Sequence, residues 1–320
     1  MIVKPLEVPL ALKQLQALKR RLPSGHPKTE SIKKALAART AGYVGERALV
    51  YPLSFINNDF KIFHDVRLFD GQHYFQIDVL IVTKAFIVIL EVKNIAGTLY
   101  FDSEFSQLIR IQNDVKEPFP DPLIQIKRQE MQFSTWLKKF DFPDLPIKTF
   151  IIIANPRTIL QTSSKNSSIH QKVLHSSIIP FKMNELENVL NQKILTTDQV
   201  NELVARLANE HALSQTDMLK RFEIKREDVL PGVYCSACCN LTMKKAFKSL
   251  WTCSICSHTM ENAHHPALED YALLFQKTIT NREARFFLDI PSSSIVKKLF
   301  NQMNMKPVGH SKLSFYRINV

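Results

Sequence analysis

Short apolar runs separated by turn residues are the feature that most constrains the fold of this chain. Asp59–Asp65, Tyr74–Val82 and Phe86–Lys93 are rich in Val, Ile and Phe, and a helical pattern over about Pro122–Lys139 separates them from a further run, Thr149–Ala154. Runs of this length and composition predict strands. Their alternation with helical patterns predicts an α/β fold, with a mixed β-sheet flanked by helices.

The positive charge of the chain is concentrated at its two ends. The net charge is +12. Residues 1–40 hold nine basic against two acidic side chains (+7), residues 41–220 hold 19 against 20 (−1), and residues 221–320 hold 14 against eight (+6). Basic ends indicate a polyanionic partner, most often nucleic acid, although ordinary solubility charge is the alternative.

No apolar run in the sequence is long enough to cross a membrane. The longest runs, such as Phe86–Leu90 and Phe150–Ala154, fall well short of the roughly 20 residues that a spanning helix needs. Basic residues interrupt every early apolar run, which argues against a signal peptide. We therefore expect no integral membrane association and a cytoplasmic location.

Charged side chains lie in two of the predicted strands: Asp78 near the middle of Tyr74–Val82, and Glu91 and Lys93 where the apolar run of Phe86–Lys93 ends. Alternate side chains of a strand share a face, so Gln76 and Asp78 point one way, and Glu91 and Lys93 share a face across Val92. If the two strands are neighbours, these four side chains converge. A same-face ion pair on an exposed sheet is the alternative interpretation of Glu91 and Lys93.

Such a cluster has the groups that phosphodiester hydrolysis needs. The carboxylates of Asp78 and Glu91 can hold Mg²⁺ (or Mn²⁺), a cation that prefers oxygen ligands and lowers the pKa of a bound water. Lys93 can orient or deprotonate that water, or stabilise the transition state. Gln76 can position the water or the scissile phosphate.

These motifs, in their order, resemble those of the nuclease-related domain (NERD), a branch of the PD-(D/E)xK nuclease superfamily with a restriction-endonuclease-like core. The resemblance covers about residues 40–155. The residues that carry it are Gly42, Gly45 and Glu46, then Gln76, Ile77 and Asp78, then Glu91, Val92, Lys93, Asn94 and Gly97, and finally Asp121, Pro122, Leu123, Gln125 and Arg128.

The resemblance implies a role for each matched position. Glu46 would complete the metal site from a helix, Asp78 and Glu91 would be metal ligands, and Lys93 would be the catalytic lysine. Gln125 and Arg128 lie three residues apart on the predicted helix and would contact the phosphate backbone; an exposed polar face is their alternative. Two departures stand out: Pro52 predicts a short or kinked first helix, and Asp121 stands where the family often has Asn.

All five cysteines fall within one short segment, which indicates a metal site rather than a disulfide scaffold. Cys235 and Cys238 form one Cys-x-x-Cys pair and Cys253 and Cys256 a second, with 14 residues between the pairs. Four thiolates at this spacing predict a structural Zn²⁺ site that resembles a zinc ribbon. Cys239 is the surplus cysteine and is expected to be a packing residue.

The last 55 residues predict a winged helix-turn-helix. Thr280–Leu288 and a helix capped by Ser292 form the predicted helix pair, and Lys312–Asn319 the wing strand. The side chains expected to reach nucleic acid are Ser293, Ser294, Lys297, Lys298, Lys312 and Arg317. Helical hairpins are also common for purely structural reasons.

Together these patterns predict four segments. They are a basic helical extension (1–40), a nuclease-like α/β domain (41–220), a zinc-ribbon-like module (230–262) and a winged helix-turn-helix-like domain (266–320). The predicted function is metal-dependent cleavage of nucleic acid, with DNA favoured over RNA. The alternatives are a non-catalytic DNA-binding or regulatory protein on a nuclease-like scaffold, and a general interaction protein.

Overall fold

A computed structural model describes residues 1–162, 167–214, 216–309 and 314–318, and confirms the predicted mixed α/β class. The chain forms two compact units. Unit 1 comprises Met1–Glu7 and Thr40–Ser214, and unit 2 comprises Val8–Arg39 and Gln215–Val320. Residues 1–40 are thus shared between the units, and none of the described helices is long and apolar enough to cross a membrane.

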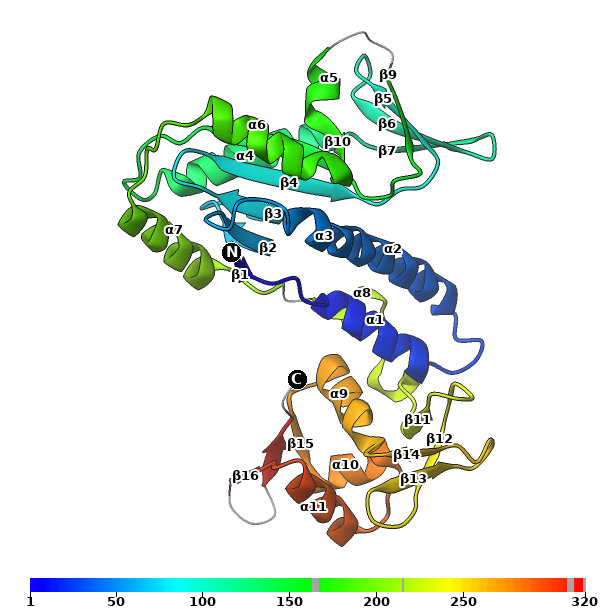
Figure 1. Cartoon of the computed structure of the whole chain (residues 1–320). Coiled ribbons are helices and arrows are strands. Elements are labelled where there is room, and N and C mark those ends of the chain that lie inside the picture. The colour runs from blue at the N-terminus through cyan, green and yellow to red at the C-terminus, as the bar shows by residue number, and fades with distance from the viewer. Residues whose placement is uncertain (163–166, 215, 310–313, 319–320) are drawn as a thin grey trace. The chain divides into compact units, whose positions relative to one another are not determined.

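The main sheet of unit 1 has the strand order β1-β2-β3-β4-β8-β10 (Figure 1). Its strands are β1 (Ile2–Lys4), β2 (Lys61–Phe69), β3 (Tyr74–Val82), β4 (Ile87–Lys93), β8 (Ile147–Ile153) and β10 (Val173–His175). The β2, β3 and β4 strands are antiparallel neighbours, whereas β4, β8 and β10 run parallel. The sheet is therefore mixed, as the sequence predicts.

Helices cover both faces of this sheet. One core joins the sheet to α4 (Pro122–Leu137) and α7 (Thr197–Glu210), and the other joins it to α3 (Val50–Leu53) and α6 (Ile179–Val189). Neighbouring residues of β4 alternate between the two cores, since successive side chains of a strand point to opposite faces. The apolar runs of the sequence are continuous because both faces of the sheet are buried.

The alternation of faces is reset in the middle of β2 and β3. Ile62 packs into one core but Val66 packs into the other, although an even spacing should keep them on one face. Between them Asp65 has φ +53°, a left-handed conformation that non-glycine residues seldom adopt. Asp65 lies across from Asp78, because the flanking register pairs His64 with Val79 and Val66 with Ile77. The irregularity thus coincides with the residue predicted to bind metal.

A second sheet in unit 1 was not predicted from the sequence. Its order is β7-β6-β5-β9, and it consists of β5 (Thr98–Asp102), β6 (Gln107–Gln112), β7 (Val115–Pro120) and β9 (Ile159–Thr162). The first three strands fill the chain between β4 and α4. Unit 1 also contains α5 (Ser167–Lys172) and a 3-10 turn at Ser176–Ile178.

The predicted basic helical extension (1–40) is helical only in part. Its first helix is α1 (Leu10–Arg21), because Pro5 and Pro9 interrupt the preceding segment and residues 2–4 pair with β2. The helix predicted to carry Glu46 is α2 (Thr29–Ala48), which begins within this extension. The short α3, which contains Pro52, follows directly.

Unit 2 is built around α1 and a small sheet with the order β11-β12-β13-β14. The buried guanidinium of Arg21 fixes α1 in place: Nε donates to Asp270 Oδ2 at 2.8 Å, and Nη1 donates to the carbonyls of Leu230 and Gly232 at 3.1 Å. The sheet strands are β11 (Val233–Cys235), β12 (Asn240–Lys245), β13 (Leu250–Cys253) and β14 (Thr259–Glu261). The sequence predicted α1 as a helix but not its place in this core.

The rest of unit 2 has the order helix, strand, helix, helix, strand, strand. These elements are α9 (His264–Leu274), β15 (Thr278–Thr280), α10 (Asn281–Leu288), α11 (Ser293–Gln302), β16 (Pro307–Val308) and β17 (Phe315–Arg317). Ser292 caps α11, as the sequence predicts, and Thr280 caps α10 through a capping box with Glu283. The α8 helix (Met218–Arg221) and a 3-10 turn at Arg226–Asp228 precede the sheet.

Candidate functional site

The candidate site lies where β3 and β4 stop pairing. Their ladder runs from Val82–Ile87 to Val79–Leu90 and goes no further. Two residues beyond Leu90, the backbone N–H of Val92 donates to Asp78 Oδ2 at 2.8 Å, so a side-chain carboxylate takes the role that a strand carbonyl has elsewhere. Meanwhile β4 continues to pair with β8 as far as Lys93. We call this opening between the two strands the fork.

Glu91 and Lys93 lie on the β4 side of the fork, within a network of side-chain hydrogen bonds. The Nζ atom of Lys93 is 2.7 Å from Glu91 Oε1 and donates to Gln125 Oε1 at 2.9 Å. Glu91 is 3% exposed, and its other oxygen, Oε2, accepts from Gln129 Nε2 at 2.7 Å. The predicted same-face arrangement of Glu91 and Lys93 is therefore present, but in a buried setting rather than on an open sheet.

The helix α4 bridges the fork. Gln129 Nε2 donates both to Glu91 Oε2 on β4 and to the backbone carbonyl of Gln76 on β3, at 2.7 and 2.9 Å. Asp121 caps this helix by accepting from the N–H of Leu123, so an acid serves where the family often has Asn. Sequence reasoning missed Gln129, although its four-residue spacing from Gln125 places both amides on one helix face.

The carboxylates in the fork repel one another. Burial raises the pKa of Asp78 well above its ordinary value, and the nearby charges of Glu91 and Glu46 raise the pKa further. The Val92 N–H and the Lys93 ammonium oppose this rise only in part. Excess negative potential around oxygen ligands is what a divalent cation relieves, so the donor set fits Mg²⁺ or Mn²⁺.

Gly45 allows α2 to approach the end of β4 closely. A Cβ atom built at Gly45 would lie 2.6 Å from Cβ of Asn94 and 3.6 Å from a methyl of Val92. Asn94 in turn donates from Nδ2 to the carbonyl of Ala41 at 2.8 Å. This close packing sets the next residue, Glu46, within electrostatic range of Asp78.

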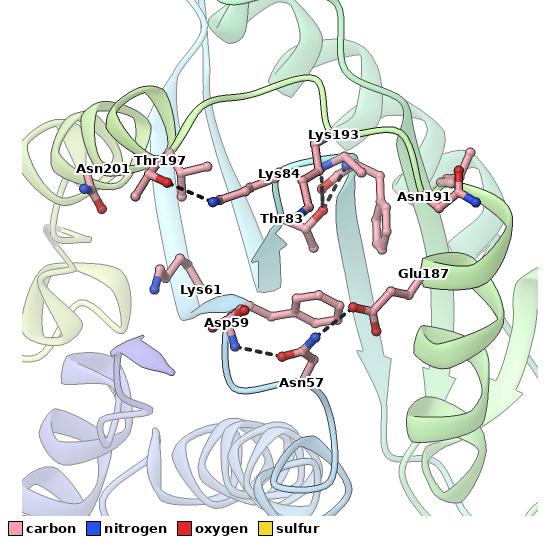
Figure 2. Close-up of a pocket in the computed structure, with 15 residues that line it drawn as sticks. Asn57, Asp59, Lys61, Thr83, Lys84, Glu187, Asn191, Lys193, Thr197 and Asn201 are labelled. Carbon is pink, nitrogen blue, oxygen red and sulfur yellow. Dashed lines mark hydrogen bonds between the residues drawn. The ribbon is translucent and has the colours of Figure 1, made fainter.

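Two predicted residues lie outside this network. The side chain of Gln76 donates to Asp65 Oδ1 at 2.7 Å, so only its backbone carbonyl joins the fork. Arg128 is exposed on α4, whereas Gln125 lies against Lys93. A pocket of about 420 Å³, shown in Figure 2, contains none of the predicted site residues, because it opens near the start of β4 rather than at its end.

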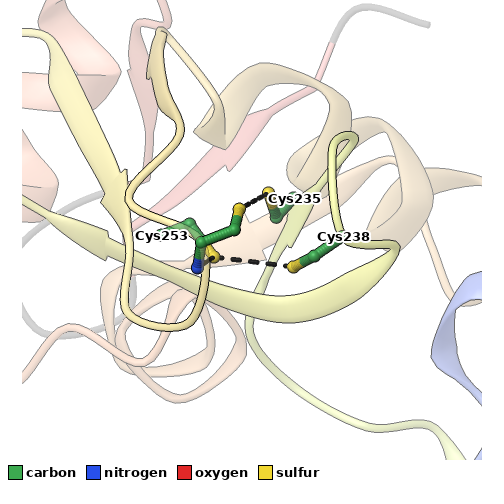
Figure 3. A group of neighbouring side chains, drawn as sticks. Cys235, Cys238 and Cys253 are labelled. Carbon is green, nitrogen blue, oxygen red and sulfur yellow. Dashed lines mark hydrogen bonds between the residues drawn. The ribbon is translucent and has the colours of Figure 1, made fainter.

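The thiols of the predicted zinc ligands face one another in unit 2 (Figure 3). The four Sγ atoms of Cys235, Cys238, Cys253 and Cys256 lie within 4.8 Å of one another. The Cys235–Cys256 and Cys238–Cys253 separations are 3.7 and 3.6 Å. A tetrahedron with Zn–S bonds of about 2.3 Å has edges of roughly 3.8 Å, so the spacing fits Zn²⁺.

The backbone around Cys253 favours its thiolate form. N–H groups of Cys256 and Ile255 point at its Sγ, at 3.5 and 3.4 Å, and with Thr242 they lower the pKa of Cys253 to about 5. Cys239 is exposed, has φ +57° and contacts the carbonyl of Ser236, so it stays outside the cluster. Among the described residues, no other group of three or more acidic, thiol or imidazole side chains has its ligand atoms this close together. Taken as a group of three with Glu46, the carboxylates of the fork are also farther apart than these thiols.

The residues predicted to contact nucleic acid from the C-terminal segment lie on the open side of α11. Ser293, Ser294, Lys297 and Lys298 are all exposed, while Val296, Leu299 and Phe300 are buried. Ser293 Oγ donates to Asn281 on α10 at 2.9 Å. Arg317 is exposed on β17, and Lys312 lies outside the described residues.

Comparison with known proteins identifies the segment that contains the fork. Residues 41–154 match the family described as NERD, nuclease-related domain. No curated protein and no solved structure matches the chain. The match confirms the resemblance drawn from the motifs, and it runs from α2 through the end of β8, so it includes every residue of the fork network.

The two glycines of α2 should respond oppositely to alanine. At Gly42 nothing lies within 4 Å of an added Cβ, so Gly42→Ala should raise the free energy of unfolding by up to about 1 kcal/mol through helix propensity. At Gly45 the clash with Asn94 should outweigh that gain and cost about 1–3 kcal/mol. Urea unfolding of both variants measures this, and a shift in the same direction for both would contradict the account.

Freshly purified protein should contain about one zinc ion per chain, measured by elemental mass spectrometry. Cys253→Ser should lose the metal because it removes one of four thiolates. The matched variant Cys239→Ser should keep it, since Cys239 lies outside the cluster. A zinc content near zero in the wild type, or its loss in Cys239→Ser, would show that the thiols serve another purpose.

Proposed function

From the nuclease-related domain at residues 41–154, we propose that the protein is a metal-dependent nuclease that hydrolyses phosphodiester bonds, with DNA as the favoured substrate. The observation that carries the proposal is the fork, which gathers two acids, a lysine and two amides where the inner strands β3 and β4 separate. If these strand ends were simply solvated, Glu91 would be exposed. Instead Glu91 is 3% exposed, and each of its carboxylate oxygens accepts a hydrogen bond.

Asp78 and Glu91 would hold Mg²⁺ or Mn²⁺, and Glu46 on α2 would add a further negative charge near the cation. When bound, the cation supplies Lewis acidity and a water of lowered pKa. Gln129 keeps Glu91 directed into the fork, and Val92 N–H keeps Asp78 there. Both carboxylates are thus positioned before substrate arrives.

Lys93 is the cation that the chain itself supplies. Gln125 and Glu91 hold its ammonium at the mouth of the fork, and its side chain is 23% exposed. From there it donates to a phosphate oxygen or orients the attacking water, which lowers the free energy of the charged transition state. Gln125 acts as its positioning residue.

Cleavage of plasmid DNA should require Mg²⁺ or Mn²⁺ and stop in EDTA. Asp78→Asn and Lys93→Met should each lower the cleavage rate by about 10²–10⁴-fold, the range for lost acid–base or electrostatic groups. Asp114→Asn is the matched control, because Asp114 is exposed in the β6–β7 turn. Equal cleavage by all proteins, or none by the wild type while DNA is still bound, would instead favour a non-catalytic binding protein.

We further propose that unit 2 binds DNA through α11. The order of elements from α9 to β17, with the sheet order β15-β17-β16, is the order expected of a winged helix-turn-helix. Lys297 and Lys298 are exposed on the second helix of the pair, where they are free to approach phosphates. The neighbouring zinc module would support this segment structurally.

The Lys297→Ala/Lys298→Ala variant should bind duplex DNA more weakly and with a flatter salt dependence. Each phosphate contact that is lost should reduce the slope of log affinity against log salt by roughly 0.9. Lys220→Ala, an exposed lysine of α8, is the control. Fluorescence anisotropy over a salt series measures the slopes, and an unchanged slope in the double variant would exclude α11 from the interface.

A further inference from the structure

The pocket of Figure 2 lies at the other end of the main sheet from the fork. Its walls come from the start of β2, the β3–β4 turn, the end of α6, the loop that follows it and the first turns of α7. The turn precedes Ile87, whereas Glu91 and Lys93 close β4. At about 3.3 Å per residue, the pocket and the lysine of the fork are roughly 20 Å apart.

Hydrogen bonds fix the walls of this pocket before any ligand arrives. Thr83 Oγ1 donates to the carbonyl of Phe86 at 2.8 Å and accepts from its N–H at 2.9 Å, which closes the turn. The carbonyl of Lys84 accepts from the N–H groups of residues 194 and 195, so the loop before α7 is tied to the turn. Asn57 Nδ2 donates to Glu187 Oε1 at 2.7 Å and links a third wall.

Three lysines from three segments converge on this space. Lys61 begins β2, Lys84 lies in the β3–β4 turn and Lys193 lies in the loop after α6. The acids in the lining are Asp59 and Glu187, and Asn57 already donates to Glu187. With three lysines against two acids, the lining carries a net positive charge that suits a phosphate, and the Lys84 ammonium is positioned by donating to Thr197 Oγ1 at 2.8 Å.

The remaining lining suits the body of a nucleoside. The amides of Asn191 and Asn201 each offer donors and an acceptor, as base edges and ribose hydroxyls require, whereas the amide of Asn57 already bonds to Glu187 and to the N–H of Asp59. Leu190 and Val200 add apolar surface for a ring face. The volume of about 420 Å³ falls within the roughly 300–1,000 Å³ of small-molecule sites.

We propose that this pocket binds a nucleoside 5′-monophosphate, with the phosphate held by Lys61, Lys84 and Lys193 and the base by the amides of Asn191 and Asn201. The site is separate from the fork, so occupancy leaves the proposed metal ligands untouched. Its binding is measurable without any cleavage, and the failure of either proposal is visible independently of the other.

Isothermal titration calorimetry of the full chain with AMP, GMP, CMP and UMP tests the proposal, with inorganic phosphate, ribose 5-phosphate and adenosine as comparison ligands. At least one nucleotide should bind more tightly than all three comparison ligands. Lys61→Ala/Lys193→Ala should weaken that binding by about tenfold or more per lysine, because each loses a charge-assisted hydrogen bond. Lys116→Ala, an exposed lysine on β7, should bind as the wild type does.

Asn201→Trp supplies a second variant that fills the pocket from the exposed side of α7 and leaves the lysines in place. It should abolish nucleotide binding. The ligand-free variant should unfold at the same temperature as the wild type and the Lys116→Ala control. No binding by the wild type at millimolar nucleotide would overturn the proposal. So would equal affinity for ribose 5-phosphate, or binding that survives in both pocket variants.

Discussion

The candidate site depends on a single break in β-pairing. Because β3 and β4 separate after Val79 and Leu90, Val92 loses its strand partner, and the Asp78 carboxylate takes its N–H instead. A buried N–H without an acceptor would cost roughly 1–3 kcal/mol, so the carboxylate is both a structural partner and a candidate ligand. The left-handed backbone at Asp65, directly across β2, accompanies this break and shifts the faces of both strands.

Separate parts of unit 1 then supply the remaining groups of the site. Glu91 and Lys93 lie at the end of β4, where it still pairs with β8. The helix α4 contributes the amides of Gln125 and Gln129. Because Gly45 has no side chain, α2 packs close enough to place Glu46 near the site. The hydrogen bond from Gln129 gives the buried carboxylate of Glu91 a partner. Burial and the repulsion among the acids raise the pKa of Asp78, and the Val92 N–H and Lys93 offset this rise in part.

Local rules were enough to predict the strands β3, β4 and β8, the capped helices α10 and α11, and the cysteine cluster. They also predicted that Asp78 lies near Glu91 and Lys93, because these residues occupy same-face positions on two strands expected to be neighbours. They failed where long-range packing decides. The side chain of Gln76 turns to Asp65 because the faces are reset there, and Gln129 enters the network only because α4 crosses the fork. The sheet of β5–β7 and β9 was missed because its strands are short and one of them, β7, is exposed along most of its length.

Unit 2 is discontinuous along the chain, and this imposes an order on its assembly. Arg21 is fully buried, yet its carboxylate partner, Asp270, lies 249 residues later. At a synthesis rate of roughly 5–20 residues per second, α1 leaves the ribosome tens of seconds before that partner exists. Residues 40–214 are completed during this interval and can fold first. Until the later residues of unit 2 are made, the apolar side of α1 has no native partner to cover it.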